Sequence, residues 1–230
     1  MGILSKIINY IAKPIPIKKN VSDITAVKTC IKVAKEGGSI ALSPEGNRTY
    51  SGQTGHFNPA IVGLIKLLNL PVLIYRIEGG YNALPRWADK PRKGKVRAYV
   101  KNVIPQERVA SLSKEQLLQL LTQELHNNDY DLTENYTGKR KAEYLERVAY
   151  VCPKCGLSQF ISHKNTITCQ DCGLEVEYLD NKQLKCTNDE FSFKNYLEWY
   201  NYQNNFINNF DLFSQKDAYY REQCNLFKVI

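Results

Sequence analysis

Two short cysteine pairs are the residues with the clearest chemistry in this sequence. Each pair belongs to a C-x-x-C-G pentapeptide, and the four cysteines are Cys152, Cys155, Cys169 and Cys172. A C-x-x-C turn directs two thiolates at one ion, and the glycine that follows permits a tight backbone turn beneath the sulfurs. Two such turns, 13 residues apart, supply the four sulfurs of a tetrahedral zinc ribbon. The spacing predicts one structural Zn²⁺ ion, because four thiolates leave no open coordination position for catalysis.

The spacing of the other cysteines and of a nearby histidine is weaker evidence for metal binding. Redox pairs or free buried thiols are the alternatives to a metal site, but neither explains the doubled spacing. His163 lies between the two pairs and could replace one cysteine, although we interpret it as a polar strand residue. Cys30 is interpreted as a small core residue, and Cys186 and Cys224 have no partner spacing. Paired thiols in a chain without an export signal favour a reducing compartment, so we expect a cytoplasmic protein.

A second candidate site follows an apolar run at residues 39–43. This run, SIALS, predicts a buried strand, and the loop PEGNR comes directly after it. Loops at the carboxyl ends of strands are where α/β sheets bind ligands. Arg48 offers a planar fork for a phosphate, Glu45 can orient its neighbours, and Gly46 lets a ligand approach the backbone. On these grounds alone, a phosphate site and an ordinary polar loop are equally good interpretations.

The stretch SIALSPEGNRTYSG resembles the F-P-E-G-T-R-S block of the glycerophosphate and lysophosphatidate acyltransferase family. Two neighbouring blocks stand in the family's order. Residues 15–19 (IPIKK) resemble its short strand that ends in a substrate-binding arginine. Residues 70–74 (LPVLI) resemble its proline-led apolar strand on the acyl side. The resemblance covers about residues 3–125, and the Pro-Glu-Gly-x-Arg block is its most specific part.

The resemblance implies an acyltransferase of phospholipid biosynthesis. The enzyme would transfer a fatty acyl group from acyl coenzyme A or acyl carrier protein to a glycerol-phosphate acceptor, such as 1-acyl-sn-glycerol 3-phosphate. Lys19 stands where the family has arginine, which keeps the charge but loses bidentate geometry. Asn47 and Thr49 replace the family's Thr and Ser and remain polar. The substrate-phosphate-binding residues implied by the resemblance are Glu45, Gly46, Arg48 and Lys19.

The family's catalytic block, N-H-x-x-x-x-D, is absent from this sequence. Its histidine acts as the general base on the acceptor hydroxyl and precedes the block that ends in arginine. The histidines here are His56, His126 and His163, and none precedes the PEGNR loop. His126 and Asp131 have the H-x4-D spacing, but we interpret this match as a coincidence. We therefore expect a truncated or inactive form with no catalytic residues, because losing a general base costs roughly 10²–10⁴ in rate.

Helices and strands alternate through the first part of the chain. Apolar periodicity predicts helices at residues 24–34, 60–69 and 113–127. Apolar runs predict strands at residues 39–43, 71–77 and 95–104. Such alternation implies βα units on a partly parallel sheet. The predicted fold class is α/β: a partial acyltransferase-like sheet with flanking helices, a small zinc-ribbon module and a helical tail rich in aromatic residues.

Four parts are predicted along the chain. Residues 1–130 form an acyltransferase-like α/β domain that is incomplete on its N-terminal side, and residues 131–150 form a connector. The zinc ribbon occupies residues 151–180, and the aromatic-rich helical tail occupies residues 181–230.

The charge distribution narrows the choice of partners. Residues 1–150 carry 23 Lys and Arg against 13 Asp and Glu, whereas residues 151–230 carry 8 against 10. A basic first part favours nucleic acid, anionic lipid or a phosphate ester. The basic residues at 76–108 could contact the inner face of the membrane peripherally, or they form a solvated loop. The amphipathic first residues of the chain could also lie on the membrane, or they pack on the domain. Because the ribbon is poor in basic and aromatic residues, a nucleic-acid-binding or scaffold protein ranks second.

Overall fold

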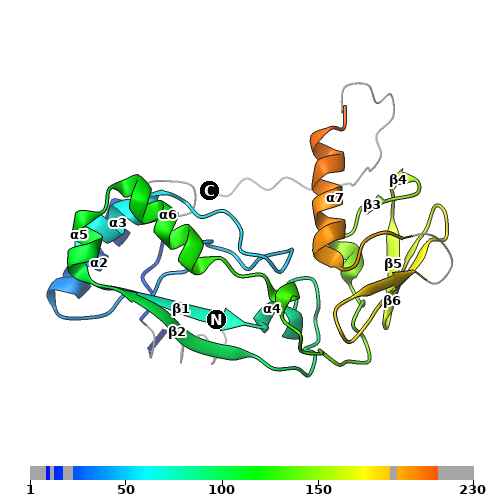
Figure 1. Cartoon of the computed structure of the whole chain (residues 1–230), viewed down its shortest axis with the longest axis horizontal. Coiled ribbons are helices and arrows are strands. Elements are labelled where there is room, and N and C mark those ends of the chain that lie inside the picture. Colours follow the sequence, from blue (N-terminus) through cyan, green and yellow to red (C-terminus); the bar gives the residue numbers. More distant parts are fainter. Residues whose placement is uncertain (1–8, 11–12, 18–22, 187–190, 212–230) are drawn as a thin grey trace, which may run out of the picture. The chain divides into compact units, whose positions relative to one another are not determined.

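The chain folds into two compact units that interleave along the sequence (Figure 1). The computed structural model describes residues 9–10, 13–17, 23–186 and 191–211. The first unit comprises Met1–Asn47, Gly55–Tyr75 and Val100–Leu125. The second unit comprises Arg48–Thr54, Arg76–Tyr99 and His126–Ile230. The chain therefore leaves and re-enters each unit more than once.

The helices of the first unit lie where apolar periodicity predicts them. They are α2 (Ile24–Lys35), α3 (Ala60–Leu68), α5 (Gln106–Ser111) and α6 (Lys114–Leu125). Asp23 begins α2, because its side chain accepts a hydrogen bond of 3.0 Å from the Ala26 N–H. Asn69 ends α3 in the left-handed conformation, with φ of 46°. The predictions of helices at residues 24–34, 60–69 and 113–127 are confirmed.

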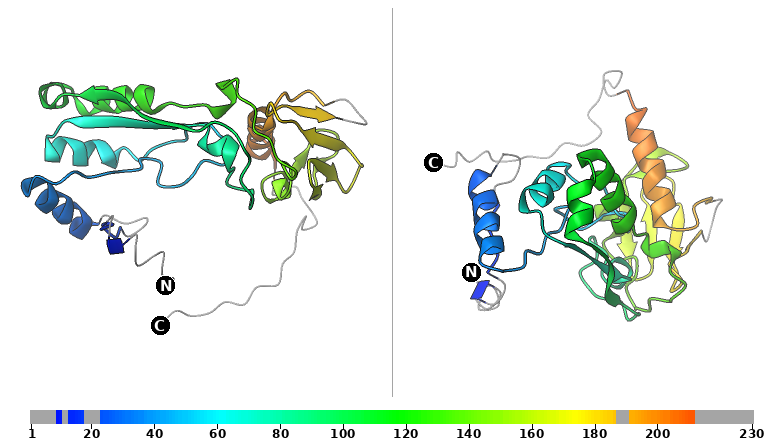
Figure 2. Two further views of the ribbon diagram at one scale, coloured as in Figure 1. Left: turned by 90° about the horizontal axis from the view of Figure 1, so that it is seen from below. Right: turned by 60° about the vertical axis from the view of Figure 1, so that its left-hand side comes forward.

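An apolar core holds this unit together. Helix α3 packs against α2, α5 and α6, as the views of Figures 1 and 2 show. Lys66 on α3 donates its ammonium protons to the backbone carbonyls of Val109 and Leu112, which fixes α3 to the end of α5. The buried core residues are Val62, Ile65, Ile74, Ile104, Val109, Leu117 and Leu121.

Strands β1 (Val72–Glu78) and β2 (Arg97–Ile104) form a two-stranded sheet. They run in opposite directions in Figure 1, and residues of both units contribute to each strand. These strands confirm the predictions at residues 71–77 and 95–104. The side chain of Ile74 is buried, whereas Leu73 and Tyr75, which point to the opposite face, are 59% and 54% exposed.

The predicted strand at residues 39–43 is wrong. These residues form neither helix nor strand, and all of them except Ile40 are exposed. A strand needs a neighbour to satisfy its backbone N–H and C=O groups, and no other described strand pairs with this run. The expectation of a partly parallel sheet is also wrong for the described residues, whose strands pair antiparallel. The broad class of mixed helices and strands remains correct.

The second unit consists mainly of short antiparallel strands. Strands β3 (Val151–Cys152) and β4 (Gly156–Leu157) form one pair. A four-stranded sheet follows in sequence order, formed by β5 (Phe160–His163), β6 (Thr166–Cys169), β7 (Glu175–Tyr178) and β8 (Leu184–Cys186). Short helices α4 (Gly80–Ala83), η1 (Asp129–Asp131) and η2 (Leu145–Arg147) precede these strands. This arrangement is zinc-ribbon-like.

Helix α7 (Tyr196–Asn208) completes the second unit and confirms the predicted aromatic helix over those residues. Elsewhere in the predicted helical tail, Leu184–Cys186 form strand β8 instead, and residues 187–190 and 212–230 lie outside the described residues. Trp199 on α7 is fully buried and meets Phe160 and Phe191 edge to face, each with ring centroids 5.4 Å apart. The core of this unit also contains Trp87, which comes from the segment between β1 and β2. Within the described residues, the structure has no helix long and apolar enough to cross a bilayer.

Candidate metal centre and phosphate-binding loop

The four predicted cysteine ligands converge on one point in the second unit. Their sulfur atoms all lie within 4.8 Å of one another. The Cys152 and Cys172 sulfurs are 3.6 Å apart, and so are the Cys155 and Cys169 sulfurs. Tetrahedral coordination with metal–sulfur bonds of about 2.3 Å places sulfurs about 3.8 Å apart. The four cysteines are therefore close enough together to hold one metal ion.

Tight turns bring each pair of sulfurs together. Cys152 faces Gly156 across the β3–β4 pair, and Gly156 has a φ of 83°. In the second turn, the Gly173 N–H donates to the Cys169 carbonyl at 3.0 Å, and Gly173 has a φ of 73°. Positive φ is readily adopted by glycine because it has no Cβ. The predicted role of the glycine after each C-x-x-C pair is confirmed.

Helix α7 anchors the backbone beside the first cysteine pair. The Gln203 side-chain oxygen accepts hydrogen bonds from the N–H groups of Tyr150 and Val151, at 2.7 and 3.0 Å. The Trp199 indole N–H donates to the Val151 carbonyl at 2.9 Å. Both side chains are fully buried. The two residues that directly precede Cys152 are therefore held by three hydrogen bonds to one helix, which helps to position this ligand.

The environment of the sulfurs affects their protonation when no metal is bound. Burial raises the pKa of the Cys152 thiol well above its ordinary value. Burial acts in the same direction on Cys169, but hydrogen bonds from the backbone N–H groups of Cys172 and Asp171 lower its pKa to about 7. The Ser158 hydroxyl lies 3.0 Å from the Cys155 sulfur. Metal binding must displace protons from buried thiols such as Cys152, so its free energy and the folding of this unit are coupled.

The PEGNR loop spans the boundary between the two units. In the first unit, the Glu45 carboxylate accepts a hydrogen bond of 2.9 Å from the Gly55 N–H. Gly46 has a φ of 68°, and a Cβ placed there would have no atom within 4 Å. The backbone at Gly46 is thus exposed and free of neighbouring side chains, which leaves room for a ligand. Lys19 lies outside the described residues.

In the second unit, Arg48 lies beside a second arginine. The Arg86 guanidinium donates to the Arg48 carbonyl at 2.8 Å, and its central carbon lies 3.9 Å from the centre of the Tyr50 ring. The Arg48 side chain is exposed. The Thr49 hydroxyl donates to the Gln53 carbonyl at 2.7 Å, which closes the turn that follows. The Arg86 guanidinium therefore lies against the Arg48 backbone at this turn, where the carbonyl and the Tyr50 ring hold it.

His126 and Asp131 are both exposed. The His126 carbonyl accepts a hydrogen bond from the Arg76 guanidinium. The Asp131 carboxylate accepts one of 2.8 Å from the Asn128 side chain. Within the described residues, no hydrogen bond or ion pair joins the His126 imidazole to Asp131. Our interpretation of their spacing as a coincidence stays a prediction, which the assay described in the Discussion tests.

Sequence reasoning did not identify several residues that support these sites. Arg86 belongs to the basic region at residues 76–108, and its proximity to the Arg48 backbone depends on the fold. Gln203 lies in a segment rich in Asn and aromatic residues, with no pattern that marks it for burial. Ser158 follows the first C-x-x-C pair by three residues, and its spacing could have suggested a contact with that pair.

No family model, curated protein or solved structure matches this chain. We therefore interpret the two sites from their own residues.

Proposed function

We propose that this chain belongs to a phospholipid-biosynthetic acyltransferase and binds the phosphate of a glycerol-phosphate acceptor at the PEGNR loop. The observation that carries the proposal is the exposed Arg48 in this loop, whose backbone carbonyl accepts a hydrogen bond from the Arg86 guanidinium. A guanidinium group suits a phosphate, because it presents several N–H donors in a planar fork. The open backbone at Gly46 supports the proposal, since a ligand can approach it closely.

The acyl side of the proposed reaction is supported by β1. Leu73 and Tyr75 expose apolar surface on the face opposite Ile74. An exposed apolar strand face can bind an acyl chain, because burial of apolar surface contributes about 25 cal/mol per Å². Leu73 also lies in the block that resembles the family's acyl-side strand. The donor in this proposal is acyl coenzyme A or acyl carrier protein, and a peripheral contact with anionic membrane stays a prediction.

The chemistry of the transfer requires a base. The acceptor hydroxyl attacks the thioester carbonyl of the donor, its proton is removed, and the donor thiol leaves. Phosphate contacts hold the acceptor but do not activate its hydroxyl. In the sequence of this chain, no histidine occupies the place of the family's catalytic histidine. The proposed role of these residues is thus acceptor binding, with little turnover by this chain alone.

The metal in this proposal is Zn²⁺ with a structural role. Four cysteine thiolates in a tetrahedral arrangement are characteristic of structural zinc, and they leave no position for a substrate or water. The ion would hold the two C-x-x-C turns together and support α7 on β3.

Replacing Arg48 and Arg86 by alanine tests acceptor binding. We expect the double variant to bind glycerol 3-phosphate at least tenfold more weakly, because hydrogen bonds to charged groups each contribute roughly 1.5–3 kcal/mol. Isothermal titration calorimetry measures this change. Arg108→Ala, on α5, is the control, since it removes another exposed arginine. Equal weakening in the control, or no binding by the unaltered chain, would contradict the proposal.

A further inference from the structure

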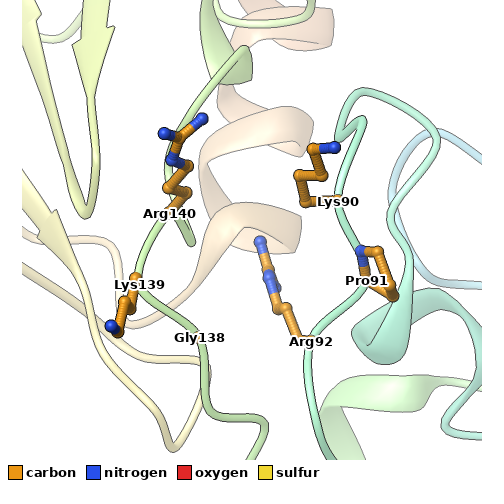
Figure 3. Close-up of a pocket in the computed structure, with 6 residues that line it drawn as sticks. All are labelled: Lys90, Pro91, Arg92, Gly138, Lys139 and Arg140. Atoms are coloured by element: carbon orange, nitrogen blue, oxygen red, sulfur yellow. The ribbon is translucent and has the colours of Figure 1, made fainter.

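A small basic cavity lies in the second unit, and none of the residues that line it belongs to the two sites described above. Its volume is about 150 Å³. This is below the roughly 300–1,000 Å³ of pockets for drug-sized ligands, so it suits a group no larger than a phosphate. None of the residues that line it is acidic. They are Lys90, Pro91, Arg92, Gly138, Lys139 and Arg140 (Figure 3).

Arg92 is the central residue of this cavity. Its side chain extends from the segment of residues 90–92 toward the gap between that segment and residues 138–140 (Figure 3). Arg92 is only 5% exposed. Its guanidinium carbon lies 4.3 Å from the centre of the Tyr178 ring and 5.0 Å from that of Trp87. The two aromatic rings therefore pack against the charged group and stabilise it in the interior.

The hydrogen bonding of Arg92 is incomplete. Its two terminal nitrogens donate to the backbone carbonyls of Asn82 and Lys141. Within the part of the chain that the structure describes, its buried Nε–H has no hydrogen-bond partner, and no carboxylate forms an ion pair with it. An arginine has five N–H donors, so these two bonds leave three of them unused. Burying a charge without a counter-ion is costly, which indicates that an anion completes this site.

The surroundings add positive charge at the cavity. Lys90 is exposed at its rim, and Arg140 lies across the gap (Figure 3). The nearby carboxylates are already paired: Asp89 with Arg147 at 2.6 Å, and Asp180 with Lys141 at 2.5 Å. The Arg140 Nε lies 3.4 Å from a carboxylate oxygen of Glu143, which leaves the terminal N–H groups of Arg140 for a ligand. The Lys139 side chain points away from Arg92 in Figure 3.

We propose that this cavity binds a phosphate group. The Nε–H of Arg92 and a free terminal N–H on the same edge form a bidentate fork for two phosphate oxygens. Lys90 and Arg140 contact the group from the rim. The phosphate belongs either to a soluble phosphate ester or to a lipid headgroup. This proposal is independent of the PEGNR loop, because the two sites share no residue.

Nuclear magnetic resonance of arginine side chains tests the proposal directly. The zinc-loaded full chain is titrated with inorganic phosphate at constant ionic strength while the Nε–H signals are followed. We expect the Arg92 signal to shift in a saturable way. The double variant Lys90→Gln, Arg140→Gln should bind phosphate roughly tenfold more weakly, because it loses two charged donors while the buried Arg92 remains.

A matched control removes the same charge elsewhere in the second unit. Lys185 on β8 and Lys194 before α7 are both exposed, and the double variant Lys185→Gln, Lys194→Gln should keep the affinity of the unaltered chain. Equal weakening in this control would overturn the proposal, because binding would then follow net charge. An Arg92 Nε–H signal that does not respond to phosphate would also overturn it.

Vesicles identify the source of the phosphate. Phosphatidylcholine vesicles with phosphatidate present a terminal phosphate, and pure phosphatidylcholine vesicles serve as the control. If phosphatidate recruits the unaltered chain and the Lys90, Arg140 variant loses this recruitment, the ligand is a lipid headgroup. If only inorganic phosphate binds, the ligand is a soluble ester. If single-stranded RNA binds through the same residues with steep salt dependence and far higher affinity than phosphate, a nucleic-acid site replaces our proposal.

Discussion

Replacing Cys152 or Cys169 by serine is expected to release the metal ion and unfold the second unit. The unaltered chain should contain about one Zn²⁺ per chain, and each variant should contain almost none. Structural zinc contributes roughly 10–16 kcal/mol to folding in small zinc-binding peptides, so the short strands around the four sulfurs should not stay folded without it. Metal analysis of the purified protein measures the first effect.

Tryptophan fluorescence measures the unfolding. The chain has two tryptophans, Trp87 and Trp199, and both are buried in the second unit. Their emission should shift to longer wavelength in the variants, whereas the helical circular dichroism from α2, α3 and α6 should persist. Cys186→Ser is the matched control, since this cysteine lies on β8 in the same unit but outside the set of four. Zinc retention by the Cys152 variant, or zinc loss in the control, would contradict the ligand assignment.

Acyl transfer by the 230-residue chain is expected to be close to background. Without a positioned base, the rate should be roughly 10²–10⁴ lower than that of a chain with one. The measurement is acylation of glycerol 3-phosphate and of lysophosphatidate, with acyl coenzyme A and with acyl carrier protein as donors. The small remaining rate should be the same in His126→Ala, because we assign no catalytic role to His126. Rapid turnover that His126→Ala abolishes would show that His126 and Asp131 are catalytic after all.

The metal centre could be predicted from the sequence because its four ligands lie in two short motifs with a characteristic spacing. The C-x-x-C-G spacing predicts which four sulfurs gather and where positive φ is needed, and the structure has both features. Helices α2, α3 and α6 could also be predicted, since an apolar stripe at helical period suits one buried face. The residues 39–43 show the limit of such reasoning. An apolar run indicates strand propensity, but a neighbouring strand decides whether it pairs.

Residues whose role depends on distant segments could not be predicted. Arginine is rarely buried, so nothing in the local sequence marks Arg92 for the interior. It is buried because Trp87 and Tyr178, which are far apart in the sequence, both pack against it. Gln203 is buried for a similar reason, since it binds backbone N–H groups that a preceding strand presents. The phosphate-binding roles of Glu45, Gly46, Arg48 and Lys19 stay predictions.

The interleaved path of the chain limits how this protein could be taken apart or recombined. Trp87 and Arg92 come from a segment between β1 and β2, yet they pack in the core that surrounds the metal centre. A fragment that begins at the first cysteine would leave the Tyr178 ring without Trp87, its edge-on neighbour at 6.1 Å. The metal-binding unit therefore cannot be transferred to another protein as one continuous segment of the chain. A recombined gene would also have to encode residues 76–99.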